Sequence, residues 1–406
     1  MTRKAHVIRD EAEIEGILSS LTPAIRAGAV VRDAERLPPA EALALIAESG
    51  LLALNVPADF GGVEASAETI VTVCRRIAAA DSSVAQYFQP HFAAVDVVSR
   101  VGSDALKRMI FSDVLNGAWI GNATAEIGGK RGVENLKTHV VEKPGGDYLL
   151  SGKKFYATGA DNGSWIAVMA KDPQGRVGIA LVPRHATGLA IGEDWTGFGQ
   201  RGTSSGTAIL ENISVPRSHF LERWRIFETP HTHGAFTQLH HIGLDLGILD
   251  AVIADAVHYV REKSRPSGDS PFDRNDQDPV VIHTFGGYEI AHRAASALVT
   301  SAARTYDRLA PFVRRPVQGG PAPLDAANQV SLEIAAAKAF TSEQTLRISS
   351  AIFEFMGASG TASAHGYDRH WRNVRTHSLH DPVRWKTHHI GNWLLNRARV
   401  PSSGII

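Results

Sequence analysis

The sequence contains almost no cysteine: Cys74 is the only one among 406 residues. A single thiol excludes an internal disulfide and any metal or iron–sulfur site built from several cysteines. No run of about 18 consecutive apolar residues occurs, and the N-terminus has no apolar segment of the kind found in signal peptides. We therefore expect a cytoplasmic protein that does not enter a membrane.

The chain also lacks a net charge, because its 42 Lys and Arg residues balance 42 Asp and Glu residues. A neutral protein exerts no long-range attraction on nucleic acid or anionic lipid, so we expect neither as a partner. Apolar residues make up 44% of the chain, which is ordinary for a globular protein, and 406 residues exceed the size of one hydrophobic core. The composition predicts several packed units.

Residues 1–118 predict an all-helical domain. Apolar residues recur at helical spacing between Ile14 and Ile25, after an N-cap at Asp10. A second helix is expected to begin at Pro38-Pro39 and to end at Gly50. The remaining helices are expected over residues 66–80 and from residue 81 into the region 105–117.

Residues 119–228 predict a β domain. Pro144-Gly-Gly-Asp forms a turn between two short runs with strand character, and Asp172-Pro-Gln-Gly separates another two. Short strands joined by tight turns, with no helices between them, favour an antiparallel barrel or sandwich over a dinucleotide-binding βαβ unit. The chain has no Gly-x-Gly-x-x-Gly motif and no phosphate-binding loop motif.

Residues 229–406 predict a four-helix bundle. Long helical periods are interrupted by Arg265-Pro-Ser-Gly and by the proline- and glycine-rich segment 316–323. The expected helices cover residues 237–264, 279–312, 324–357 and 379–396. The predicted fold class is therefore α+β, with a β domain between two helical ones.

Two segments resemble a known family. One is Asp194-Trp-Thr-Gly-Phe-Gly-Gln-Arg-Gly-Thr-Ser-Ser-Gly-Thr, and the other is Tyr367-Asp-Arg-His-Trp-Arg-Asn-Val-Arg-Thr-His-Ser-Leu-His-Asp-Pro-Val. The first resembles the β domain of the acyl-CoA dehydrogenase fold. The second resembles the flavin-dependent monooxygenases built on this fold, such as dibenzothiophene monooxygenase and the SfnB-type sulfur-acquisition oxidoreductases, and that likeness covers nearly the whole chain.

The resemblance implies a two-component monooxygenase that uses FMNH2 and O2, acts through a C4a-hydroperoxyflavin and oxidises a small organosulfur compound. A separate NAD(P)H:flavin reductase would supply the reduced FMN, since the chain has no nicotinamide-binding motif. FMN is favoured over FAD because Arg265-Pro-Ser-Gly and Met356-Gly-Ala-Ser-Gly-Thr differ from the segments that hold adenosine in FAD-using relatives. The family also implies a homotetramer.

Three catalytic residues are implied by the same resemblance. His380 would donate a proton to the peroxide formed on the flavin, with His91 as a second histidine and Thr158 as a hydroxyl that faces the flavin. Relatives commonly carry serine at the Thr158 position, so the hydroxyl is kept on a stiffer side chain. Either histidine could instead be an ordinary structural residue.

The resemblance further implies a set of cofactor-binding residues spread over the β domain and the bundle. Trp195 has an alternative role in core packing, and Arg265 has one as a charge at a helix C-terminus. The set is Asn122, Thr124, Tyr156, Thr158, Trp195, Arg265 and Gly360.

Two other functions stay open. An FAD-dependent acyl-CoA dehydrogenase needs a carboxylate base, and here Asp381 would have to serve with a shorter side chain than the usual glutamate. Asp381 also fits the N-cap of the next helix, with Pro382 in its first turn. The third possibility is a family member that binds flavin without catalysis. No metal site is expected, because the 18 histidines include no His-Glu-x-x-His motif.

Overall fold

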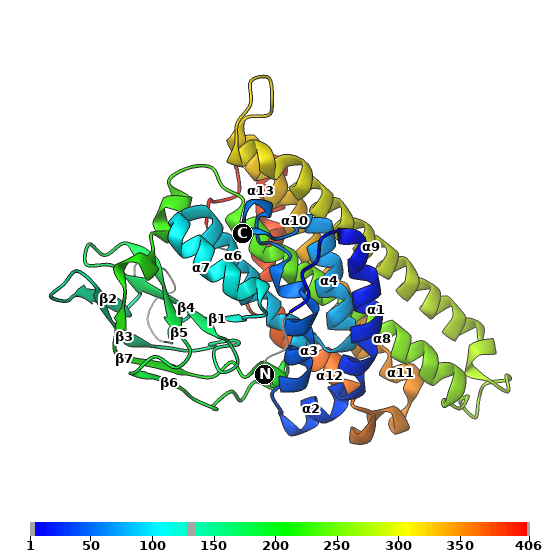
Figure 1. Cartoon of the computed structure of the whole chain (residues 1–406). Coiled ribbons are helices and arrows are strands. Elements are labelled where there is room, and N and C mark those ends of the chain that lie inside the picture. Colours follow the sequence, from blue (N-terminus) through cyan, green and yellow to red (C-terminus); the bar gives the residue numbers. More distant parts are fainter. Residues whose placement is uncertain (1–4, 128–134, 404–406) are drawn as a thin grey trace.

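The protein is described by a computed structural model that covers residues 5–127 and 135–403. A β domain lies on one side of the molecule, and the N-terminal and C-terminal helices lie together on the other (Figure 1). The predicted order of a helical, a β and a second helical region is confirmed.

The N-terminal region is helical, as predicted. Asp10 caps the first turn through a capping box with Glu13, and Gly50 ends α3 in a left-handed conformation with φ 84°. The region from residue 81 onward is divided into three helices, because Gly102 leaves the helical conformation between the last two. The helices are α1 (Ile14–Ala27), α2 (Ala29–Glu35), α3 (Ala40–Ser49), α4 (Ala67–Ala80), α5 (Ser82–Gln86), α6 (Phe88–Val101) and α7 (Asp104–Leu115).

The β domain is one sheet in the order β6-β7-β3-β2-β4-β5-β8, with β1 paired to β4. Both predicted hairpins are confirmed, since β2 pairs with β3 and β4 pairs with β5 in antiparallel fashion. The sheet is not wholly antiparallel, because β1 and β2 both run parallel to β4. The strands are β1 (Ile120–Ala123), β2 (His139–Glu142), β3 (Tyr148–Lys154), β4 (Trp165–Lys171), β5 (Val177–Pro183), β6 (Leu189–Ile191), β7 (Ala208–Val215) and β8 (Phe220–Leu221).

The C-terminal region, as far as residue 403, contains three long α-helices and three shorter ones. The expected helix over residues 379–396 begins only at Val383, and a separate helix ends before it at His377. The break follows from Pro382, since the residue before a proline disfavours the helical conformation. The helices are α8 (His233–Glu262), α9 (Pro279–Arg314), α10 (Pro323–Ala351), α11 (Phe353–Met356), α12 (Asp368–His377) and α13 (Val383–Asn396).

Helix α8 lies inside the helical part and is buried along most of its length. It approaches α4 closely because Gly243 and Gly247 face it: a Cβ on Gly247 would lie 2.2 Å from the Arg75 carbonyl oxygen. The N-terminal helices and the bundle share one hydrophobic core around α8, and the sheet has a second core of its own. Polar side chains on α8 are therefore held in an apolar, rigid surrounding.

Within the described ranges, no single helix is long and apolar enough to cross a membrane. Only the bent pair that combines the first turn and α1 with α2 meets such criteria, by length and composition alone. The apolar residues Leu18 and Ile25 of α1 are buried in the shared helical core.

Candidate active site

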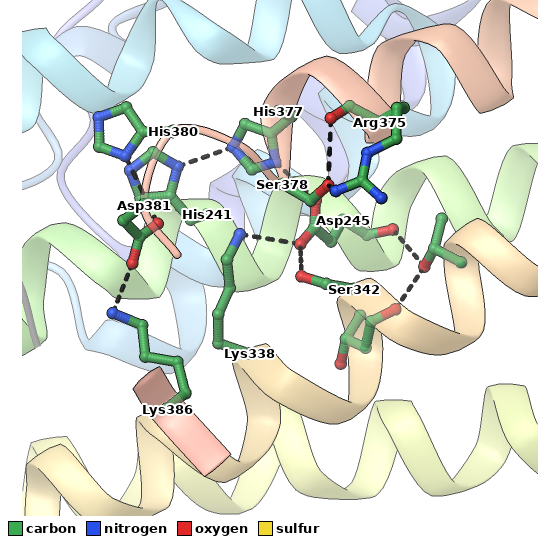
Figure 2. Close-up of polar contacts among 12 residues, drawn as sticks. His241, Asp245, Lys338, Ser342, Arg375, His377, Ser378, His380, Asp381 and Lys386 are labelled. Atoms are coloured by element: carbon green, nitrogen blue, oxygen red, sulfur yellow. Dashed lines mark hydrogen bonds and ion pairs between the residues drawn. The ribbon is translucent and has the colours of Figure 1, made fainter. Parts of the chain in front are cut away.

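Buried polar residues from three helices form one hydrogen-bonded chain (Figure 2). His377 Nδ1 lies 2.6 Å from Asp245 Oδ1, and His377 Nε2 lies 2.7 Å from His241 Nδ1. The second Asp245 oxygen accepts hydrogen bonds from Lys338 Nζ at 2.9 Å and from Ser342 Oγ at 2.5 Å. His241 and Asp245 lie four residues apart on α8, and Lys338 and Ser342 four apart on α10, so each pair shares one helix face.

The carboxylate decides which nitrogen of each imidazole carries the proton. Asp245 can only accept, so His377 Nδ1 is the donor, and Nε2 of a neutral His377 must be an acceptor. His241 Nδ1 therefore donates to it, which leaves His241 Nε2 with a lone pair. That nitrogen is buried and has no hydrogen-bond partner among the described residues. An unpartnered buried nitrogen at the end of an ordered chain indicates a place for a bound molecule.

Charge and burial act together on this chain. Burial and the positive charges around it hold the pKa of His241 well below its usual value. Burial also lowers the pKa of His377, against the opposing effect of Asp245. For the carboxyl of Asp245, burial alone would raise the pKa, but Lys338 and His377 outweigh it and keep the pKa below the usual range. The hydrogen-bonded group thus consists of an ionised carboxylate, that of Asp245, and two neutral imidazoles, those of His377 and His241.

His380 follows α12 and packs against the end of this chain. Its ring lies 4.5 Å from the His241 ring, at an interplanar angle of 34°. The side chain is 43% exposed, so it lies between solvent and the buried His241. His380 therefore connects the buried hydrogen-bonded group to the protein surface.

Asp381 does not cap α13, contrary to the prediction. Pro382 occupies the N-cap position, and no side chain caps this helix. The Asp381 carboxylate is instead buried in an ion pair with Lys386 (Figure 2). Burial alone would raise the pKa of Asp381, but His380, Lys338 and Lys386 together hold it below the usual range. A carboxylate stabilised in this way is a weak base.

The β domain contributes a second polar group, which includes the predicted Thr158. Thr158 Oγ1 lies 2.7 Å from Ser205 Oγ, which lies 2.8 Å from Thr203 Oγ1. Thr203 donates to the carbonyl oxygen of Gln200, as does Trp195 Nε1. Trp195 belongs to neither hydrophobic core, so core packing does not account for it.

Asn122 and Gln200 carry polar atoms with no partner within residues 5–127 and 135–403: Asn122 Oδ1 and both side-chain amide atoms of Gln200. The backbone N–H of Asn122 donates to the backbone carbonyl oxygen of Thr158 at 3.0 Å. Tyr156 and Gln200 both have positive φ, at 56° and 51°, and such strain in non-glycine residues concentrates at binding sites. These atoms suit a ligand with hydrogen-bond donors and acceptors along one edge.

Strand β1 approaches the loop that holds Thr158 more closely than a side chain would allow. A Cβ on Gly121 would lie 2.4 Å from the Gly159 carbonyl. Glycine at position 121 therefore lets Asn122 and Thr158 lie side by side.

Asn373 links the two polar groups. Its Oδ1 accepts from the Gln200 N–H at 2.6 Å, and its Nδ2 donates to Ser82 Oγ at 2.9 Å. Asn373 and His377 are four residues apart on α12 and share one face. Helix α12 therefore fixes the position of the β-domain group relative to the buried hydrogen-bonded histidines.

His91 lies in α6, and both of its ring nitrogens form hydrogen bonds. Nε2 lies 2.8 Å from the Leu52 carbonyl oxygen, and Nδ1 accepts from the Ile120 N–H at 3.1 Å. Burial lowers the pKa of His91 to about 4, so the ring is neutral and donates its only proton to Leu52. His91 thus positions the start of β1, two residues before Asn122. A direct catalytic role for His91 stays a prediction.

Arg265 and Gly360 are not brought to these residues within one chain. Arg265 is exposed beyond the C-terminal end of α8, while His241 lies near its start. At 1.5 Å per residue, the two are separated by roughly 30 Å. Gly360 lies at the same far end, because its neighbour Ser359 bonds the Tyr259 hydroxyl at 2.6 Å.

Four of the most connected residues of the site were not predicted from the sequence: His241, Asp245, His377 and Lys338. Two local signals exist for them: the i, i+4 spacing of His241 and Asp245 on a predicted helix, and the place of His377 in the segment 367–383 that resembles the family. Their partners lie about 90 to 140 residues further along the chain, so no local pattern joins them. Thr124, which was predicted, contributes its carbonyl oxygen to Lys154 Nζ at 3.3 Å.

Three domain families match the chain in order along its length. They are the acyl-CoA dehydrogenase N-terminal domain over residues 21–118, the middle domain over 121–213 and the C-terminal domain over 239–385. The fold and the family predicted from sequence are confirmed by these matches.

Several similar proteins are monooxygenases by name. "Dibenzothiophene monooxygenase" of Rhodococcus erythropolis is 30% identical over 368 residues, which cover 86% of this chain and 85% of that protein. "Probable FMNH2-dependent monooxygenase SfnC" of Pseudomonas putida is 31% identical over 381 residues, covering 92% and 93%. The crystal structure of TdsC from Paenibacillus sp. A11-2 with FMN and indole superposes with a TM-score of 0.90 at 26% identity, covering 98% and 100%.

Proposed function

Because the chain belongs to the flavin-dependent monooxygenases built on the acyl-CoA dehydrogenase fold, we propose that it transfers one oxygen atom from O2 to a small organosulfur compound. Bound FMNH2 would supply two electrons through a C4a-hydroperoxyflavin. One oxygen atom goes to the sulfur, and the other leaves as water with the two electrons and two protons. The observation that carries this proposal is the buried histidine chain that ends in the unpartnered His241 Nε2 beside His380.

The β-domain group fits the flavin ring. A flavin presents carbonyl oxygens and ring nitrogens along one edge. The unpartnered side-chain atoms of Asn122 and Gln200 can form hydrogen bonds with these flavin atoms. Thr158 contributes a hydroxyl held by Ser205. Tyr156 and Trp195, whose rings meet edge to face at 6.0 Å, contribute aromatic surface for the ring system.

Two features of the site favour oxygen chemistry over acyl-CoA dehydrogenation. A dehydrogenase needs a free carboxylate to remove a substrate proton, whereas Asp381 is buried in an ion pair with Lys386. Oxygen activation instead needs a proton donor, and His380 is a partly exposed imidazole that contacts His241. In this proposal His380 supplies the proton, Thr158 orients the flavin, and His91 holds β1 in place. A member that only binds flavin would have no use for this ordered chain.

The substrate and the reductase are inferred from the relatives. The name of one relative specifies dibenzothiophene, an organosulfur compound, and TdsC holds indole, which is also a flat aromatic molecule but contains nitrogen instead of sulfur. Another relative is described as FMNH2-dependent. A separate NAD(P)H:flavin reductase supplies the reduced flavin to this chain in our proposal, because the chain has no nicotinamide-binding motif.

A homo-oligomer, expected to be a tetramer, would complete the cofactor site. Arg265 and Gly360 lie at the opposite end of α8 from His241 in one chain, so in this proposal a second copy brings an arginine to the FMN phosphate. Large apolar side chains also lie exposed on α9 and α13, as expected of an interface: Ile290 is 71% and Leu395 is 80% exposed. Light scattering of the purified protein tests this part of the proposal.

Rapid mixing tests the function itself. Anaerobic protein loaded with FMNH2 is mixed with oxygenated buffer, and flavin absorbance is followed over time with and without an organosulfur substrate such as dibenzothiophene. We expect a long-lived intermediate before oxidised FMN appears, and an oxygenated substrate as product. His380→Ala should shorten the lifetime of the intermediate by about 100-fold, whereas His139→Ala, at an exposed histidine of β2, should not change it.

The alternatives give different results in the same experiment. Immediate return to oxidised flavin with release of hydrogen peroxide contradicts a monooxygenase. Bleaching of bound FAD by an acyl-CoA under anaerobic conditions would support the dehydrogenase instead.

A further inference from the structure

Histidine–aspartate pairs recur in the helical part, but they differ in the partner of the second histidine nitrogen. Besides Asp245–His377, the described ranges contain four such pairs: Asp96–His233 at 2.8 Å, Asp250–His292 at 2.7 Å, Asp255–His370 at 2.7 Å and Asp381–His380 at 3.5 Å. The second nitrogen of His292 lies 3.5 Å from a carboxylate oxygen of Glu289. Of the pairs in the described ranges, only Asp245–His377 continues through a hydrogen bond to a second imidazole. The far nitrogen of that imidazole, His241 Nε2, is the unpartnered atom of the candidate site.

A chain of this kind has two protonation states that differ by one proton. In the neutral state, both imidazoles carry their proton on Nδ1, and His241 Nε2 accepts. If one proton is added, His377 carries protons on both nitrogens, next to the Asp245 carboxylate, and His241 must carry its proton on Nε2. The same atom then donates. The added positive charge stays on His377, 2.6 Å from a carboxylate, rather than on His241.

We propose that Asp245, His377 and His241 form a proton relay that switches His241 Nε2 between hydrogen-bond acceptor and hydrogen-bond donor toward the molecule bound at the site. His241 is the residue that contacts the bound molecule, and Asp245 and His377 act through it. Protons enter from solvent through His380, whose ring lies 4.5 Å from that of His241. The identity of the bound molecule, reduced flavin or substrate, rests on the proposed function.

The relay is surrounded by groups that set its charge. Lys338 compensates Asp245, so the neutral state is favoured at rest, and a proton is held only transiently. The titratable and charged groups that face the relay are His240 from α8, Lys338 from α10 and His380 from the turn after α12. Asp381, paired with Lys386 of α13, faces His380 and Lys338.

Nitrogen-15 NMR of histidine-labelled, flavin-free protein tests the relay without reference to activity. At about pH 8 we expect both His241 and His377 as the Nδ1–H form, whereas free histidine prefers Nε2–H. On acidification, one joint transition should convert His241 to the Nε2–H form and His377 to the doubly protonated form. Separate transitions of the two residues, or His241 with a proton on Nε2 at about pH 8, would overturn the relay.

His377→Gln keeps both hydrogen bonds, since the amide donates to Asp245 and accepts from His241, but it cannot pass a proton. The joint transition should disappear in this variant. The rate of substrate oxidation should fall by about 100-fold, while the Kd for FMN stays within about twofold. The matched control is His292→Gln at the Asp250 pair, which should leave both readouts unchanged. An unchanged oxidation rate in His377→Gln refutes the relay.

The wild-type NMR measurement needs no variant, so it decides the relay even if His377→Gln does not fold. It also separates this inference from the proposed function. A wild-type protein that shows the joint transition but never oxygenates a substrate contradicts the monooxygenase and leaves the relay in place. A protein that oxygenates a substrate without the joint transition refutes the relay and leaves the monooxygenase in place.

Discussion

Replacing Lys338 with methionine removes a fully buried cation while keeping most of the side-chain volume. Lys338 Nζ lies 2.9 Å from Asp245 Oδ2, and neither side chain is exposed. Removal of one partner of a buried ion pair usually destabilises a protein by about 3–5 kcal/mol, because the other charge is left unpaired. Here the remaining carboxylate also contacts His377, which can take up a proton and replace the lost cation. The penalty of Lys338→Met should therefore depend on pH.

The direction of that dependence follows from the pKa of His377. In the wild type, burial holds this pKa below the ordinary value, so the unfolded chain binds the proton first and acidification below about pH 6.5 weakens the fold. In Lys338→Met, the uncompensated Asp245 should raise the pKa of His377 above about 6.5. The folded variant then binds the proton first, and its stability is lost as the pH rises through the raised pKa.

An opposite charge at this range shifts a pKa by about 1–3 units, and each unit corresponds to about 1.4 kcal/mol. We therefore expect the destabilisation by Lys338→Met to be larger at pH 8 than at pH 6 by about 1.4–3 kcal/mol. Urea denaturation followed by tryptophan fluorescence, at equal protein concentration for both pH values, measures the free energy of unfolding.

Arg372→Met is the control for Lys338→Met. Arg372 forms an ion pair with Asp33, whose contacts in the described part of the chain include no histidine. Its penalty should be the same at both pH values, since a carboxylate does not titrate between them. An equal penalty at pH 6 and pH 8 for Lys338→Met as well would refute the coupling of Lys338 to His377 through Asp245.

Gly121→Ala should weaken FMN binding at least 10-fold and destabilise the fold by about 1–3 kcal/mol, because the new methyl group would lie 2.4 Å from the Gly159 carbonyl. Fluorescence titration measures the FMN affinity and thermal unfolding measures the stability, and an unchanged FMN affinity would contradict the close packing of β1. Thr158→Ser should keep FMN affinity within about twofold, whereas Thr158→Val should lose about 10-fold through one hydrogen bond; equal affinities of the two variants would show that the hydroxyl is not used. Arg265→Ala should weaken FMN binding about 10-fold or more without changing the thermal stability of the flavin-free protein, and an unchanged Kd would leave Arg265 as a helix-end charge.

Local signals in the sequence predicted most of the fold. The capping box at Asp10, the glycine that ends α3 and the turn at Pro144 each act over a few residues, so the sequence alone determines them. The expected helix over residues 379–396 began too early, and the alternative start with Asp381 as N-cap was one residue off, because Pro382 occupies the N-cap of α13. The Asp381 carboxylate does not cap the helix because it forms an ion pair with Lys386 in the folded chain.

The candidate site likewise contains residues that the sequence could predict and contacts that it could not. Thr158, Asn122 and Trp195 could be named because the sequence resembles a family along nearly its whole length, yet their hydrogen-bond partners could not be named. The helical period of α8 predicts that His241 and Asp245 share a face, but not that His377 and Lys338 complete their chain. Those contacts arise only when α8, α10 and α12 pack together. Sequence thus determined the elements and their faces, while tertiary packing decided which buried charges meet, because interhelical contacts depend on the mutual fit of distant segments.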